Sequence, residues 1–183
     1  MANEPIHLDP EYQSRLTLQD YAPQPRIAGV ELQDLRRHVD DAGAFLELGR
    51  LQSGTLRNRS GFQVRQLNYT VLQPGTIKAF HLHLSQAEIW FVPPDSRLLA
   101  GLLDVRRGSP TVRTVMRLVL GDGHSRLLHI PAGVAHGVSN PGSGPAAMFY
   151  FADQEFDPDP GRCDERRLPW DTLGAAFWEP ERG

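Results

Sequence analysis

The chain has 183 residues, of which 40% are hydrophobic and 22% charged, and its formal net charge is −3. This length and composition are typical of one globular domain with a substantial core. The small net charge argues against a nucleic-acid partner, and no apolar run approaches the roughly 18 residues of a membrane-spanning helix.

Two regions are expected along the chain. Residues 1–29 are polar and dotted with proline, which predicts an extended or irregular arm. Residues 30–183 are expected to form the domain, and the mixed periodicity at its start allows a short helical turn around Leu32–His38. The tail from Asp157 is Pro-rich and charged, but it keeps large aromatic residues, so we expect it to pack on the domain.

From Phe62 onward the sequence consists of short apolar runs separated by Gly and Pro. Many short strands at such spacing predict an all-β, antiparallel sandwich or barrel with short helical or irregular terminal segments. The expected strands lie within 62–71, 88–92, 98–105, 114–120, 125–130 and 146–151.

The cysteine count and the start of the chain bear on the compartment. Cys163 is the single cysteine, so there is no intrachain disulfide framework, and a reducing compartment is favoured. The first residues lack the basic-then-apolar pattern of a secretory signal peptide. We therefore expect a cytoplasmic protein.

Two motifs carry the candidate chemistry. The first, starting at Gly75, reads G-x5-H-x-H-x4-E and contains His81, His83 and Glu88; the second reads P-x-G-x2-H-x3-N and contains His136. In a strand His81 and His83 point to the same face, because side chains alternate with period two. If Glu88 and His136 face the same space, these four residues form a site for Zn, Fe, Mn or Ni. Glu88 has an alternative role as the partner of Lys78 in a buried salt bridge.

Together the two motifs resemble the signatures of the cupin superfamily. That resemblance implies a jelly-roll barrel from about Phe62 to Phe156, with the site inside it. We therefore expect the histidines of both motifs to face one cavity.

Over a longer span, from about Asp41 to Trp178, the chain resembles the dTDP-4-dehydrorhamnose 3,5-epimerase family. Six segments resemble motifs of that family in the same order, several with substitutions or a missing position, and the spacing between the second and third is ungapped. They are D-x-R-G-x-F-x-E at Asp41–Glu47, Q-x-N at Gln66–Asn68, R-G-L-H at Lys78–His81, D-x-R-x-G-S-P-T at Asp104–Thr111, I-P-x-G-x-A-H-G at Ile130–Gly137, and W-x-D-P-x-L-G-x-x-W at Trp170–Trp178.

The resemblance implies an epimerase that removes a proton beside the C4 ketone of a nucleotide-linked 4-keto-6-deoxyhexose, without a cofactor. His81 would be the general base, since an imidazole titrates near neutral pH. Asp171 would be its carboxylate partner, with Glu165 as the alternative, and Tyr150 would donate the second proton.

The resemblance also assigns substrate contacts. Lys78 and His136 would hold the oxyanion or a phosphate, and Gln66 and Asn68 would contact sugar or pyrophosphate. It implies a role in dTDP-rhamnose and polysaccharide biosynthesis, and a homodimer formed by exchange of N-terminal strands.

Several positions depart from the family pattern. Ala42 stands where an arginine would touch the diphosphate, and Lys78 replaces the arginine of R-G-L-H, so the bidentate fork is lost. Glu88 stands where a lysine would stabilise the enolate, and Phe156 replaces a tyrosine. The same glutamate completes the metal-ligand set. A metal-binding cupin, acting as an isomerase, an oxygenase or a non-catalytic sugar-binding module, is therefore the alternative function.

Overall fold

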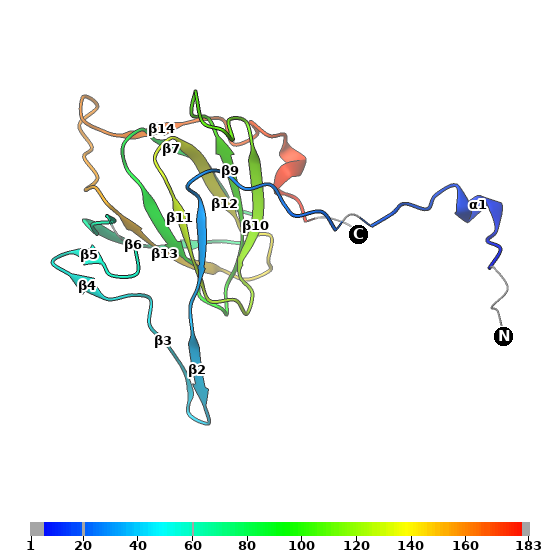
Figure 1. Ribbon diagram of the computed structural model, residues 1–183, viewed down its shortest axis with the longest axis horizontal. Helices are drawn as coiled ribbons and strands as arrows, with labels where there is room; N and C mark the ends of the chain where they lie inside the picture. The colour runs from blue at the N-terminus through cyan, green and yellow to red at the C-terminus, as the bar shows by residue number, and fades with distance from the viewer. Residues whose placement is uncertain (1–5, 20, 60, 181–183) are drawn as a thin grey trace.

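Two five-stranded antiparallel sheets form the body of the protein (Figure 1). The computed structural model describes residues 6–19, 21–59 and 61–180. In spatial order, one sheet contains β1 (Glu31–Asp34), β11 (Arg126–Ile130), β8 (Glu88–Phe91), β13 (Ala146–Ala152) and β6 (Gln66–Leu72). The other contains β10 (Val115–Gly121), β9 (Arg97–Asp104), β12 (Val134–Ser139), β7 (Ile77–His83) and β14 (Glu165–Arg167). The predicted all-β jelly roll is confirmed.

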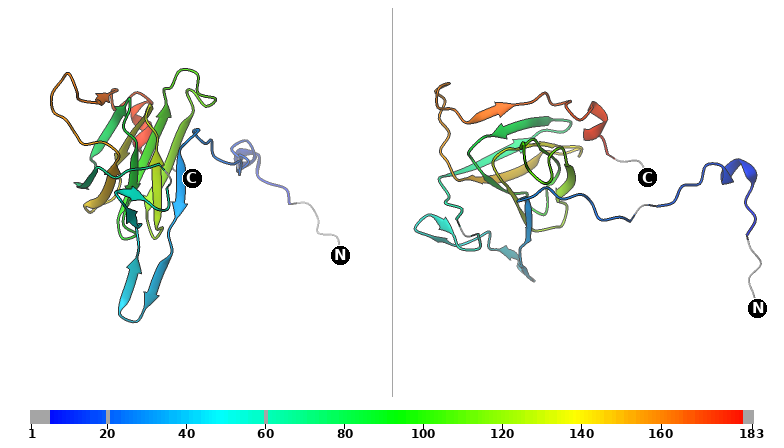
Figure 2. Two further views of the ribbon diagram at one scale, coloured as in Figure 1. Left: turned by 60° about the vertical axis from the view of Figure 1, so that its left-hand side comes forward. Right: turned by 45° about the horizontal axis from the view of Figure 1, so that its top comes forward.

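The remaining elements lie outside this barrel. A hairpin of β2 (Arg37–Asp40) and β3 (Gly43–Leu46) projects from it, and β4 (Leu51–Gln52) pairs with β5 (Thr55–Leu56) (Figure 1). The arm carries α1 (Pro10–Gln13) and runs away from the barrel in all views (Figure 2). It reaches the core at Ile27, which is buried. No helix among the described residues is long and apolar enough to cross a membrane.

The turn expected around Leu32–His38 is wrong, because this segment belongs to β1 and β2. Strand β1 pairs with β11, with Leu32 opposite Leu128, almost a hundred residues along the chain. Such long-range pairing overrides the weak local preference of a mixed sequence.

Strand alternation sends the side chains to an inner and an outer layer. On β7, His81 and His83 point into the barrel, whereas Phe80, the residue before His81, packs outward against Trp178, with ring centroids 5.3 Å apart. The inner layer is apolar at one end, where Leu72, Leu98 and Leu128 are buried together. Polar residues replace the apolar ones toward the other end, and there the barrel opens into a cavity.

The C-terminal segment covers the outer face of the second sheet. It ends in the 3₁₀ helix η1 (Ala175–Trp178), whose Trp178 is buried and donates its indole N–H to the carbonyl of Trp170. The close approach depends on Gly101, because a Cβ there would lie 2.4 Å from Phe177 and 2.8 Å from Trp178.

Candidate active site

A cavity of about 390 Å³ occupies the polar end of the barrel. Side chains from both sheets line it, because each strand presents every second residue to the interior. The predicted residues that line it are Gln66, Asn68, Lys78, His81, His83, Glu88, His136 and Tyr150.

His81 pairs with a carboxylate on the neighbouring strand. Its Nδ1 lies 3.0 Å from Oε1 of Glu165 on β14, and each side chain retains about a quarter of its exposure (26% and 24%). Burial, aided by the charge of Arg167, lowers the pKa of His81, while the charge of Glu165 opposes this shift. His81 is therefore a neutral imidazole at neutral pH, which is the form that accepts a proton.

Asp171 does not stand behind His81, so that assignment is corrected. Asp171 is exposed in the turn before η1, where its backbone carbonyl accepts a hydrogen bond from Gly174, and it does not line the cavity. Glu165, the alternative partner, takes the place because β14 pairs with β7 and lays its side chain beside the imidazole.

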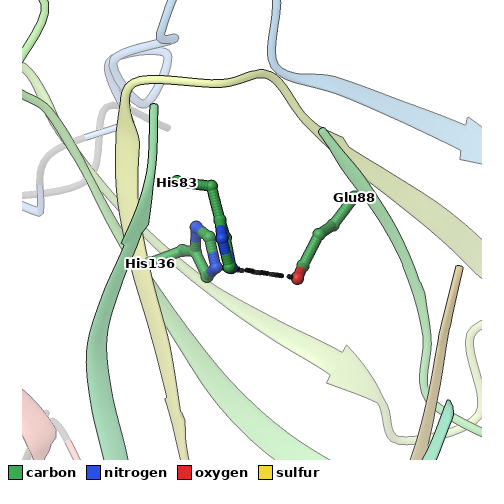
Figure 3. Close-up of side chains that lie close together, drawn as sticks. All are labelled: His83, Glu88 and His136. Carbon is green, nitrogen blue, oxygen red and sulfur yellow. Dashed lines mark ion pairs between the residues drawn. The ribbon is translucent and has the colours of Figure 1, made fainter. Parts of the chain in front are cut away.

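A second group lies deeper in the cavity and comprises His83, Glu88 and His136 (Figure 3). All three are buried, and one ligand-type atom from each lies within 4.8 Å of the others. Nε2 of His83 is 3.3 Å from Oε1 of Glu88, and Nε2 of His136 is 3.6 Å from its Oε2. The structure thus brings together three of the four predicted metal ligands. The fourth, His81, is engaged by Glu165 instead.

Two donors orient the Glu88 carboxylate. The indole N–H of Trp90 donates to Oε2 over 2.6 Å, and the side-chain amide of Gln86 donates to Oε1 over 2.9 Å. Burial raises the pKa of Glu88, but the hydrogen bond from His83 and the charges of the two histidines outweigh it and lower this pKa to about 2. Glu88 is therefore an anion, and its expected salt bridge with Lys78 is replaced by contacts with histidine.

The pKa values of the two histidines of this group shift in opposite directions. Burial lowers the pKa of His83, but its hydrogen bond to Glu88 and the nearby carboxylates more than reverse this effect, so the net shift is upward. Burial dominates at His136 and lowers its pKa. Nδ1 of His136 lies 2.9 Å from the carbonyl oxygen of Val134, to which it donates its hydrogen.

The backbone beside His136 is also specialised. Strand β12 is irregular between His136 and Val138, where its pairing with β7 shifts register. A Cβ on the intervening Gly137 would lie 2.3 Å from the Cβ of Ala79. Glycine thus allows the two histidine-bearing strands to approach closely.

Tyr150 faces the cavity from the opposite sheet. It lies on β13, paired with Trp90 on one side and Asn68 on the other. Burial, with the negative charges of Glu88 and Glu165, raises the pKa of its phenol. Tyr150 is therefore held protonated and can donate its proton.

The polar side chains on β6 and Lys78 form the remaining wall. The amide of Gln66 donates to Asn68 Oδ1 over 2.8 Å, and Lys78 Nζ lies 3.2 Å from Thr70 Oγ1. These residues offer amide, hydroxyl and ammonium groups to a polar ligand.

Sequence reasoning missed Gln86, Trp90 and Asp164. Asp164 closes the cavity from the loop before β14 and accepts hydrogen bonds from the backbone N–H groups of Leu84, Ser85 and Gln86. Gln86 and Trp90 could have been found, because both lie two residues from Glu88 and so share its face. No motif or spacing in the sequence indicated that Asp164 lies at the cavity.

Comparison with known proteins identifies the family of this chain. Residues 24–176 match the family model described as dTDP-4-dehydrorhamnose 3,5-epimerase. The chain belongs to this family. The sugar-epimerase prediction is thereby confirmed at the level of the family.

Two curated relatives align over most of their length. One is the spore coat polysaccharide biosynthesis protein SpsL of Bacillus subtilis, 36% identical over 156 residues, which cover 85% of this chain and 98% of the relative. The other is the probable low-salt glycan biosynthesis epimerase Agl13 of Haloferax volcanii, 29% identical over 80% of this chain and 90% of the relative.

Solved structures share the fold. A dTDP sugar isomerase from Desulfovibrio desulfuricans has a TM-score of 0.68 at 26% identity, covering 80% of this chain and 88% of the other. A Legionella pneumophila epimerase in complex with dTDP-4-keto-L-rhamnose has a TM-score of 0.66 at 22% identity, covering 79% and 75%. At 22% identity, the second supports the fold alone.

Proposed function

We propose that this protein epimerises a nucleotide-linked 4-keto-6-deoxyhexose by removing a proton beside the ketone and returning one from the other face. The observation that carries the proposal is the arrangement of His81, Glu165 and Tyr150. A neutral imidazole backed by a carboxylate and a protonated phenol line one cavity from opposite sheets. The family membership supports the same chemistry.

The first step is proton abstraction by His81. Its Nε2 takes the C–H proton, and the electrons of that bond move to the keto oxygen to give an enolate. The resulting imidazolium donates its Nδ1–H to Glu165, whose charge stabilises it. A positioned general base of this kind contributes on the order of 10²–10⁴-fold to the rate.

The second step delivers a proton to the opposite face. Tyr150 gives its phenolic proton to the carbon, and the electrons of the enolate re-form the ketone, so the configuration at that carbon is inverted. Solvent then reprotonates the tyrosine and removes the proton from His81, and no other reactant is consumed.

The nucleotide end of the substrate is assigned to the wall of Gln66, Asn68, Thr70 and Lys78. The Lys78 ammonium has no carboxylate partner among the described salt bridges, so its charge is available to a phosphate. Ala42 lies in the turn of the β2–β3 hairpin and supplies no charge. Lys78 is therefore assigned the main electrostatic contact.

Assembly and cellular role complete the proposal. Strand β6 is an edge strand whose outward side chains Leu67, Tyr69 and Val71 are exposed by 59%, 60% and 40%. Such an apolar edge supports a homodimer. The names of the relatives support a role in polysaccharide biosynthesis, and the single cysteine supports a cytoplasmic location.

Solvent-deuterium exchange tests the chemistry. Wild-type protein in D₂O with a dTDP-4-keto-6-deoxyhexose should incorporate deuterium at the carbons beside the ketone, as followed by NMR. His81→Asn should lower the exchange rate by about 10²–10⁴-fold. His124→Asn, at an exposed position away from the cavity, is the matched control and should retain the wild-type rate. Absence of exchange with every such substrate tried would refute the assignment.

A further inference from the structure

The proton transfers assigned above use His81 and Tyr150 and leave the deeper group of three side chains unexplained. We propose that His83, Glu88 and His136 bind one divalent transition-metal ion. The site is argued from its own geometry, whereas its part in catalysis rests on the proposed function.

The spacing of the three side chains suits one ion. In a tetrahedral site with bonds of about 2.0–2.1 Å, ligand atoms lie about 3.4 Å from one another. Nε2 of His83 lies 3.3 Å from Oε1 of Glu88 and Nε2 of His136 lies 3.6 Å from Oε2, and one ligand atom of each residue lies within 4.8 Å of the other two. The three residues lie on β7, β8 and β12, so the barrel itself holds them in place. Two imidazoles and one carboxylate are a donor set that Zn, Fe, Mn and Ni accept.

The orientation of His136 is a second, independent observation. Its Nδ1 is 2.9 Å from the backbone oxygen of Val134, which can only accept a hydrogen bond, so the ring hydrogen sits on Nδ1. Nε2 then directs a lone pair toward Oε2 of Glu88, another lone-pair donor. A cation between them satisfies both. Metal-bound histidines are typically fixed by such a hydrogen bond from the other ring nitrogen.

The contacts of His83 and Glu88 differ from those of His136. Nδ1 of His83 is buried without a hydrogen-bond partner among the described residues, and the nearest carboxylate oxygen recorded for it, on Asp164, is 3.8 Å away. Glu88 is held by Trp90 and by Gln86, whose amide nitrogen is also 3.4 Å from Nε2 of His83. Gln86 therefore borders the proposed ion position, and rotating its amide presents an oxygen to the ion.

The charges around the cavity favour a cation. Five carboxylates line it, whereas its lysine and arginine side chains are only two, and Arg162 is already paired with Asp157 and Asp159. The carboxylates belong to Glu88, Glu155, Asp157, Asp164 and Glu165. This excess of negative charge attracts a divalent ion into the group.

A metal at this position also accounts for Glu88. The enolate of the proposed reaction needs a nearby positive charge, and Glu88 stands where the family pattern has lysine. An ion bound by Glu88 supplies that charge, so the carboxylate no longer opposes the reaction. His81 stays free to act as the base, because it pairs with Glu165 and is not one of the three clustered side chains.

Metal titration tests the site without reference to activity. The full chain, freed of metal by a chelator and dialysed, is titrated with Zn²⁺ by calorimetry and with Co²⁺ by visible absorption. We expect one equivalent to bind, with d–d bands that report nitrogen and oxygen ligands. Glu88→Gln and His136→Gln should each weaken binding at least 100-fold. The control is His129→Gln, which alters another buried histidine with its Nδ1 3.0 Å from a backbone carbonyl and should bind as wild type.

The possible outcomes test the metal site and the proposed epimerase activity independently. The metal site is overturned if wild-type protein binds less than a tenth of an equivalent of metal. It is also overturned if Glu88→Gln leaves metal binding unchanged while its circular dichroism and unfolding midpoint match wild type. Should a substitution fail to fold, the Co²⁺ spectrum of the wild type decides, since an octahedral all-oxygen spectrum also overturns it. Deuterium exchange at full rate in metal-free protein removes the catalytic role of the ion and leaves the epimerase intact. Metal binding without any exchange leaves the site and refutes the epimerase.

Discussion

Replacing Glu165 by glutamine removes a charge beside the proposed base and preserves the shape of the side chain. Glutamine keeps an oxygen able to accept the Nδ1–H of His81, so the imidazole should hold its orientation. What is lost is the attraction between a carboxylate and the imidazolium that forms as His81 takes the proton. The variant therefore tests the charge of Glu165 separately from its position.

The expected loss in kcat can be estimated from the distance between Nδ1 of His81 and Oε1 of Glu165. Unit charges 3.0 Å apart attract by about 1.4 kcal/mol in a water-like medium and about 5.5 kcal/mol at an effective dielectric constant of 20. Because both side chains are about a quarter exposed, we place the effect near the lower end, at about 2 kcal/mol. This corresponds to a loss of roughly 30-fold in kcat. KM should change little, since the carboxylate lies behind the imidazole and does not touch the sugar.

Deuterium exchange at saturating and limiting substrate measures kcat and KM separately. Glu165→Asp should recover part of the rate, because it restores the charge at a longer distance. Asp171→Asn is the matched control, since it makes the same change at the carboxylate first expected to fill this role, and it should leave both constants unchanged. A large loss in Asp171→Asn with none in Glu165→Gln would refute the reasoning.

Three further predictions concern other parts of the structure. Tyr150→Phe should lower net inversion more than deuterium exchange, because the first proton can still leave; equal losses by NMR would contradict its role as the acid. Asp104→Asn should destabilise the fold by about 2–4 kcal/mol in urea unfolding, because Asp104 is buried and accepts hydrogen bonds from Arg106, Ser109 and Thr111. These bonds hold the pKa of Asp104 well below its usual value. The Asp104 carboxylate therefore contributes fully to the free energy of unfolding above about pH 4, and this contribution is lost as the pH falls further. The difference in free energy of unfolding between wild type and variant should therefore narrow in acid. Gly137→Ala should lower the unfolding midpoint, because its Cβ would collide with Ala79; an unchanged midpoint would contradict the close approach of the strands.

The inner face of the barrel could be predicted because it depends on local patterns. A period of two puts His81 and His83 on one face whatever the rest of the chain does. The second motif then supplied His136, and the family resemblance supplied Tyr150. These four residues line one cavity, with the ring centroids of His81 and His136 6.3 Å apart.

The partner of His81 could not be chosen in the same way. Glu165 and Asp171 lie six residues apart in a tail without periodicity, and motif position favoured Asp171. Only the pairing of β14 with β7, across some eighty residues of chain, brings Glu165 to the imidazole. The mistaken turn at Leu32–His38 has the same cause, since β1 exists through its pairing with β11.

Two histidines only two residues apart on β7 thus have different tasks because different carboxylates hold them. His81 lies near the cavity mouth with Glu165, where its side chain is 26% exposed and the proton it takes can return to solvent. His83 lies deeper with Glu88, where its side chain is 9% exposed and a charge, once bound, is shielded from water. A carboxylate near the surface suits a base that must release its proton in every cycle. A buried carboxylate suits a permanent charge, which is why we assign proton transfer to His81 and ion binding to His83.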